Sequence, residues 1–84
     1  MDKNLIYTKH AEERLRMRNI RKELVENVID NPDKVIKKES VTISQKVLDE
    51  KMIRVVYKQV ENAYIVITAY LTIKKRYREG SDKK

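Results

Sequence analysis

The sequence predicts an α+β fold, with two N-terminal helices packed on one face of an antiparallel sheet of about four strands. Two observations predict it. Apolar residues recur at helical spacing up to residue 30, and from residue 34 onward apolar and polar residues alternate as in half-exposed strands. The 84 residues suffice for one small domain, which we expect over residues 1–78. Residues 79–84 are glycine, serine and charged residues at a terminus, and we expect a disordered tail there.

Two helices are expected before residue 31. Thr8 can cap the first helix, and Asn19 can end it, because asparagine tolerates the left-handed backbone conformation. The second helix is expected over residues 21–30, before the Asn31-Pro32 pair that stops it. Its apolar stripe consists of Leu24, Val25, Val28 and Ile29.

The remaining elements are expected to be strands over residues 34–38, 41–48, 52–60 and 63–73, after a short extended segment at residues 3–7. Strict alternation in the last strand places one row on the core side, namely Ile65, Ile67, Ala69, Leu71 and Ile73. The opposite row is Tyr64, Val66, Thr68, Tyr70 and Thr72, and the neighbouring strand adds Arg54, Val56 and Lys58 to the same open face. Rings beside cations suit nucleobase stacking and phosphate binding. Tyrosine and threonine are also common in strands that have no such task.

Composition and charge limit the classes of function. A formal net charge of +7 favours polyanionic partners, of which nucleic acid is the commonest, although surface charge that only aids solubility is also frequent. The chain has no cysteine and one histidine, so we expect no metal site and no cofactor. It has no long apolar run and no signal peptide, so we expect no membrane association and a cytoplasmic location.

The first helix carries the most informative polar pattern. His10, Arg14 and Arg18 follow one another at intervals of four residues and share one side of the helix. Arg16 lies on the opposite side, where Glu12 and Glu13 are within reach. Arg14 and Arg18 have no acidic residue at those spacings, so their partner is expected elsewhere in the fold or in an anionic ligand such as a phosphate. The lone histidine can equally be structural.

A second basic segment follows the last strand. Lys74, Lys75, Arg76 and Arg78 place four cations in five residues around Tyr77. Because the run adjoins the predicted open face, we expect Lys74, Lys75 and Arg76 to contact phosphates. The alternative is a solvated charge run.

Several segments together resemble a known family. They are His10-Ala11-x-x-Arg14-Leu15-x-x-Arg18, the Asn-Pro pair, Arg54-Val55-Val56-Tyr57 and Val66-Ile67-Thr68-Ala69-Tyr70. They are similar to a widespread family of small bacterial and archaeal proteins described as a domain of unknown function. That family has been grouped with the RelE/ParE-like toxins and with the barnase–EndoU–colicin–RelE fold of metal-independent ribonucleases. The resemblance implies a RelE/ParE-like fold and RNA as the substrate.

The expected activity is therefore metal-independent RNA cleavage through the 2′-hydroxyl, of toxin type. His10 suits proton transfer near neutral pH, Arg14 suits a phosphate clamp, and Tyr70 can orient the substrate or donate a proton. Arg18, Arg54 and Thr68 are further candidates for binding the phosphate. The alternative is a non-catalytic module that binds RNA or protein. In a toxin, an acidic antitoxin is the expected protein partner.

One geometric question stays open at this stage. Helices that cover the core face would place His10 away from Tyr70, unless the first helix reaches the edge of the sheet.

Overall fold

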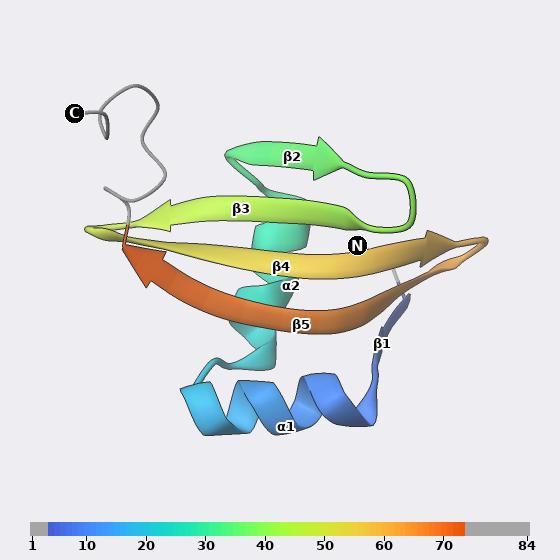
Figure 1. The fold of residues 1–84 in the computed structure, drawn as a ribbon, viewed down its shortest axis with the longest axis horizontal. Helices are drawn as coiled ribbons and strands as arrows, with labels where there is room; N and C mark the ends of the chain where they lie inside the picture. The colour runs from blue at the N-terminus through green and yellow to red at the C-terminus, as the bar shows by residue number, and fades with distance from the viewer. Residues whose placement is uncertain (1–3, 74–84) are drawn as a thin grey trace.

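The fold is built on one five-stranded sheet with the strand order β1-β5-β4-β3-β2 (Figure 1). A computed structural model describes residues 4–73 of the chain. The elements in chain order are β1 (Asn4–Tyr7), α1 (Lys9–Arg18), α2 (Lys22–Asp30), β2 (Lys34–Lys37), β3 (Thr42–Leu48), β4 (Lys51–Val60) and β5 (Ala63–Ile73). Both helices and the four longer predicted segments thus form near their expected bounds, and the architecture is α+β.

The ends of α1 form as the sequence predicts. The Thr8 hydroxyl accepts a hydrogen bond from the backbone N–H of Ala11 at 2.9 Å, and thereby satisfies one donor of the first turn. Asn19 ends the helix in the left-handed conformation, with φ of 60°. The α2 helix starts one residue later than expected, at Lys22, and Arg21 gives it no side-chain cap.

The expected four-stranded antiparallel sheet is wrong, because the N-terminal segment joins the sheet as a fifth strand. β1 pairs in parallel with the start of β5, from Asn4 opposite Ala63 to Tyr7 opposite Val66. The other neighbouring pairs are antiparallel, so the sheet is mixed. Four residues are too few to show strand alternation, and their partner strand lies at the other end of the sequence.

The expected packing of both helices on one face is also wrong. α2 crosses behind the sheet and contacts β3 and β4, whereas α1 lies along the margin of the sheet beside β5 (Figure 1). β1 covers β5 only as far as Val66, so the edge of β5 from residue 67 onward is available to α1. The apolar side chains of Ala11 and Leu15 point from α1 into the core.

The core lies between α2, α1 and one face of the sheet. Val25 and Val28 of α2 are fully buried, as are Ile53 and Val55 of β4. Ser44 is also fully buried, and its hydroxyl oxygen lies 2.9 Å from the hydroxyl oxygen of Tyr57. This hydrogen bond satisfies two polar groups that would otherwise be costly to bury.

A β-bulge in β5 changes which residues face the core. Tyr57 is opposite Val66 whereas Val56 is opposite Thr68, so Ile67 has no partner on β4. Residues 68–73 keep the predicted alternation, but of the expected core row only Ala69 is buried there, whereas Leu71 and Ile73 are exposed at the end of the strand. Before the bulge the predicted sides are wrong: Tyr64 and Val66 face the core, and Ile65 lies on the open face opposite Lys58.

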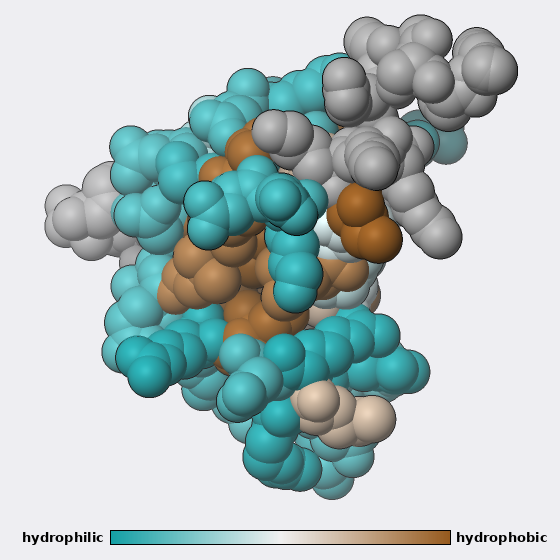
Figure 2. Space-filling model, turned by 90° about the vertical axis from the view of Figure 1, so that its left-hand side faces the viewer, coloured by the Kyte–Doolittle hydropathy of each residue, from teal (hydrophilic) through white to brown (hydrophobic). Residues whose placement is uncertain are grey.

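Apolar residues reach the surface at the end of the molecule where β3 and β5 terminate, and hydrophilic residues frame them (Figure 2). Val47, Leu71 and Ile73, near the ends of these strands, are exposed. Neither helix of the described residues is long and apolar enough to cross a membrane. The predicted phosphate contacts at Lys74, Lys75 and Arg76, and the predicted tail at residues 79–84, lie outside the described residues.

Candidate functional site

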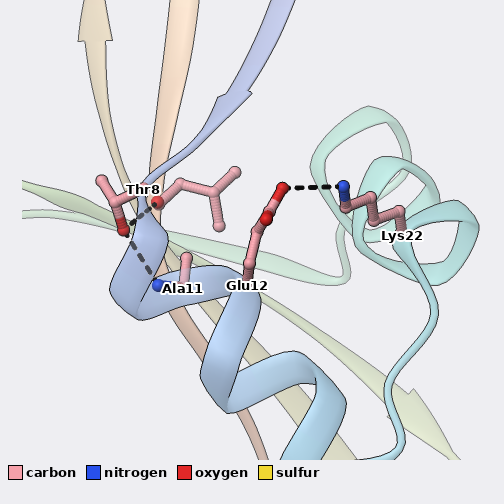
Figure 3. A network of polar contacts seen from close by, with 5 residues as sticks. Thr8, Ala11, Glu12 and Lys22 are labelled. Carbon is pink, nitrogen blue, oxygen red and sulfur yellow. Dashed lines mark hydrogen bonds and ion pairs between the residues drawn. The ribbon is translucent and has the colours of Figure 1, made fainter.

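The start of α1 is attached directly to β5 (Figure 3). The Thr8 hydroxyl, which caps the helix, also donates to the carbonyl oxygen of Val66 at 3.4 Å, and the Thr8 backbone N–H donates to the same oxygen at 3.3 Å. One turn further on, Glu12 forms an ion pair of 3.0 Å with Lys22 at the start of α2. These contacts fix the position of α1 against both the sheet and the second helix.

Arg18 attaches the other end of α1 to the same strand. Its Nη1 donates to the carbonyl oxygen of Ala69 at 2.8 Å and lies 3.5 Å from the Thr68 hydroxyl oxygen. A carbonyl at the edge of a sheet lacks a strand partner, so a guanidinium group is a suitable donor for it. Arg18 therefore joins the helix to the edge of β5, next to the open-face residue Thr68.

The stripe on α1 and the row on β5 consequently run side by side along one margin of the sheet (Figure 1). Thr8 and Val66 are hydrogen-bonded to each other, so they mark one level at which both α1 and this part of β5 begin. From that level Arg14 is about 9 Å further along the helix axis. Thr68 is about 7 Å further along the strand, and Tyr70 about 13 Å. α1 thus reaches the edge of the sheet at Thr68, whereas no contact joins His10 to Tyr70 within residues 4–73.

His10 and Arg14 contact each other within α1. The Nε of Arg14 donates a hydrogen bond of 3.0 Å to Nε2 of His10. His10 is exposed and Arg14 is half-buried. Since Nε2 accepts this bond it carries no proton, so the neutral ring holds its proton on Nδ1.

The polar part of the open face is a row across three strands. Arg54 of β4 lies opposite Tyr70 of β5, and its guanidinium carbon is 5.8 Å from the centre of the Tyr70 ring. Gln45 of β3 lies opposite Arg54 on the other side. The sequence-based prediction missed Gln45, although alternation within residues 41–48 places it on this face.

The expected surface of several tyrosines does not form within residues 4–73. Tyr64 turns to the core side, where its ring centre is 5.1 Å from that of Tyr57. Tyr70 is therefore the one predicted tyrosine of β5 on the open face. Next to its row lies a largely aliphatic row, in which Ile36, Ile43, Val56 and Thr68 are successive cross-strand neighbours.

The margin is cationic. Within residues 4–73, neither Arg14 nor Arg18 forms an ion pair with a carboxylate, and the partners they find in the fold are neutral: His10 for Arg14, and Thr68 and the Ala69 carbonyl for Arg18. Glu12 pairs with Lys22 rather than with Arg16. In the same part of the chain no three histidine, cysteine or acidic residues cluster in a way that could hold a metal ion.

Tyr7 forms a separate polar feature on the core side of β1. Its hydroxyl is buried and has no hydrogen-bond partner within residues 4–73. The ammonium group of Lys22 lies 4.7 Å from the centre of its ring. Burial, reinforced by the charges of Glu26 and Glu23, raises the pKa of Tyr7 to about 12.

Of the predicted site residues, the structure brings His10 into contact with Arg14, Arg18 with Thr68, and Arg54 with Tyr70. A shallow pocket lies elsewhere, against the β3–β4 turn, where residues 48–51 line it. Comparison with known families finds a match of residues 7–71 to the family described as Domain of unknown function (DUF4258). Neither a curated protein nor a solved structure matches the chain significantly.

Proposed function

This chain belongs to that family of unknown function, and we propose that it is a metal-independent RNA endonuclease of toxin type whose site is the margin between α1 and β5. One observation carries the proposal. Arg18 of α1 reaches Thr68 and Ala69, so the helix that carries His10 and Arg14 runs beside the strand that carries the Thr68 and Tyr70 hydroxyls. These are the groups that RNA cleavage needs in the absence of a metal ion.

The reaction would proceed by attack of a ribose 2′-oxygen on the adjacent phosphorus. His10 removes the proton from the 2′-hydroxyl, and the bond from phosphorus to the 5′-oxygen of the next nucleotide breaks as the new bond forms. The departing oxygen receives a proton from Tyr70 or from water. The products are a 2′,3′-cyclic phosphate and a 5′-hydroxyl.

The remaining side chains would bind the phosphate. Arg14 can donate two hydrogen bonds to one phosphate, because a guanidinium group presents parallel N–H donors. Arg18 and the Thr68 hydroxyl add donors at the sheet edge. Arg54, which lies against the Tyr70 ring, adds positive charge on the open face.

The finer grouping with RelE/ParE-like toxins is part of this proposal and rests on the resemblance of the His10 to Arg18 segment. An acidic antitoxin is the protein partner that the proposal implies. The formal net charge of +7 supports it, as does the aliphatic row beside the cations of the open face, because an acidic segment with an apolar side would complement both.

The test is cleavage of single-stranded RNA by the purified protein in excess chelator. We expect 2′,3′-cyclic phosphate ends, an inactive His10→Ala variant and a strongly impaired Arg14→Gln variant. Arg16→Gln is the matched control, since Arg16 lies on the other side of α1. RNA that stays intact with the wild-type protein, or cleavage that survives in His10→Ala, contradicts the proposal.

A non-catalytic RNA-binding module is the second candidate, and the hydrogen bond between Arg14 and His10 favours it. In this arrangement Nε2 is occupied and therefore cannot accept a proton from the substrate. A module of this kind would shift the mobility of RNA in a salt-sensitive manner and leave it intact.

A further inference from the structure

The contact between Arg14 and His10 controls which nitrogen of the imidazole is available. Nε2 accepts from Arg14 and Nδ1 carries the proton, as described above. A neutral histidine acts as a base only through its unprotonated nitrogen. The nitrogen that could act as a base is therefore present, but a guanidinium group covers it.

The guanidinium group that covers Nε2 also has N–H donors that do not take part in this hydrogen bond. Within residues 4–73, the Arg14–His10 bond is the one hydrogen bond of the Arg14 side chain, so both of its terminal nitrogens can bind a ligand. Arg14 is half-buried on the side of α1 that runs along β5, and Arg18 lies one turn further on. An anion near Arg14 would thus meet two guanidinium groups.

We propose that Arg14 is a positioning residue that holds His10 in the Nδ1–H tautomer and uncovers Nε2 when a phosphate group binds. The proposal rests on the proposed function in taking the RNA phosphate as the natural ligand. It goes further in giving Arg14 a second task, the preparation of the base, besides the binding of phosphate.

The direction of the exchange follows from the strengths of the bonds. A hydrogen bond from a guanidinium group to an anionic oxygen is roughly twice as strong as one to a neutral acceptor. A bidentate contact through Nε and one terminal nitrogen needs the same Nε that now binds His10. A phosphate that binds through Nε and one terminal nitrogen therefore competes with the histidine contact for one N–H group.

A premature proton on Nε2 would block the base. While Arg14 donates to Nε2, that nitrogen keeps its lone pair, so the base is in the required tautomer when the phosphate arrives. Arg14 then donates its hydrogen bonds to the bound phosphate. Nε2 is left without a donor that competes with the 2′-hydroxyl of the substrate.

The experiment is nitrogen-15 NMR of the His10 side chain, recorded on the full chain in alkaline buffer, in which imidazoles are neutral. His10 is the chain's single histidine, so its ring signals need no assignment. In buffer without phosphate, we expect Nδ1 to show the shift of a protonated ring nitrogen and Nε2 that of an unprotonated one. Inorganic phosphate has no 2′-hydroxyl that could replace Arg14 as the donor to Nε2, so it should then move the ring toward a mixture of both tautomers and shift the Arg14 Nε signal at the same concentrations.

Variants separate this role from a structural one. Arg14→Lys keeps the charge but lacks the planar Nε–H group, so the mixture of tautomers should be present even without phosphate. Arg16→Gln should behave as the wild-type protein does. A protonated Nε2 in the phosphate-free protein overturns the proposal. So does an unchanged tautomer once phosphate has saturated the Arg14 signal, or a failure of phosphate to bind.

The measurement involves no RNA and no turnover. If the tautomer responds to phosphate but RNA is not cleaved, the proposed enzyme fails while the role of Arg14 stands. If RNA is cleaved but the tautomer does not respond, the reverse holds.

Discussion

Two tyrosine hydroxyls buried in this domain have opposite surroundings. That of Tyr57 forms a hydrogen bond of 2.9 Å with Ser44, whereas that of Tyr7 has no partner within residues 4–73. A buried polar group without a partner costs free energy, and a buried group with one does not incur that cost. The same chemical change at the two positions should therefore have different effects on stability.

We predict that Tyr57→Phe lowers the free energy of unfolding by about 1–2 kcal/mol, because it leaves the Ser44 hydroxyl buried and unsatisfied. Tyr7→Phe should leave the free energy unchanged or raise it by up to about 1 kcal/mol. Urea denaturation of both variants measures the difference. Equal losses in the two variants would contradict the assigned hydrogen bonding.

Tyr7 should also impose a dependence on pH. Its pKa rises from the ordinary value of 10.0 to about 12 in the folded protein, so the folded state binds more protons than the unfolded state in that interval. The free energy of unfolding is therefore unaffected by this group below pH 10 and decreases as the pH rises toward 12, because the phenol ionises more readily in the unfolded state. The free energy of unfolding, measured with urea, should decrease less steeply with pH in Tyr7→Phe than in the wild-type protein across this range. Parallel curves would contradict the assignment.

Among the elements, β5 contains one residue without a partner on β4, Ile67, and it also forms the edge of the sheet to which α1 attaches. Ile67 is skipped in the pairing with β4, and Val66 before it and Ala69 after it are both fully buried. Because these two positions are three residues apart, strict alternation without a bulge would turn one of them toward the open face. The bulge therefore allows both halves of the strand to bury their apolar side chains.

Deletion of Ile67 should thus be tolerated, because Val66 and Ala69 then stand two residues apart and both face the core in a regular strand with the same partners on β4. We expect the deletion to lower the free energy of unfolding by about 1 kcal/mol, the scale of losing a half-buried side chain. Ile67→Ala, the matched control, should cost a similar amount, since it removes most of the same side chain. Urea denaturation compares the two variants, and a much larger loss in the deletion would contradict this account of the bulge.

The same strand shows how far sequence reasoning extends. The bounds of β5 were predictable from its uninterrupted run of strand-forming residues, and the ends of α1 from Thr8 and Asn19. The sides of Tyr64 and Val66 were not, because a bulge leaves the composition of a strand unchanged and only shifts its phase. β1 was missed because its pairing depends on a partner about sixty residues away rather than on its own four residues.

At the scale of the whole molecule, the candidate site depends on where α1 lies rather than on what it contains. The stripe of His10, Arg14 and Arg18 was visible from helical spacing. Its proximity to Thr68 was not, because that follows from β1 ending at Val66 and leaving the edge of β5 for the helix. Gln45 was missed because a single glutamine in a strand carries no signal until Arg54 is placed beside it.

The basic run after β5 supports a prediction about salt. If Lys74, Lys75, Arg76 and Arg78 contact the RNA backbone, replacing all four with glutamine should weaken binding equally for different sequences. Each lost contact should reduce the slope of log affinity against log salt by about 0.7 for single strands. Filter binding over a series of salt concentrations measures the slope. An unchanged slope would show that these cations are only solvated.

The central claim is that the helix stripe and the open-face row form one binding surface for RNA. It is tested most directly by NMR titration with an oligonucleotide of 2′-O-methyl RNA, which cannot be cleaved through the 2′-hydroxyl. We predict that the Arg14 side chain and the backbone amides of Thr68 and Tyr70 shift together and give one dissociation constant. Shifts confined to α1, or to the sheet, would contradict the claim and separate the two sets of residues.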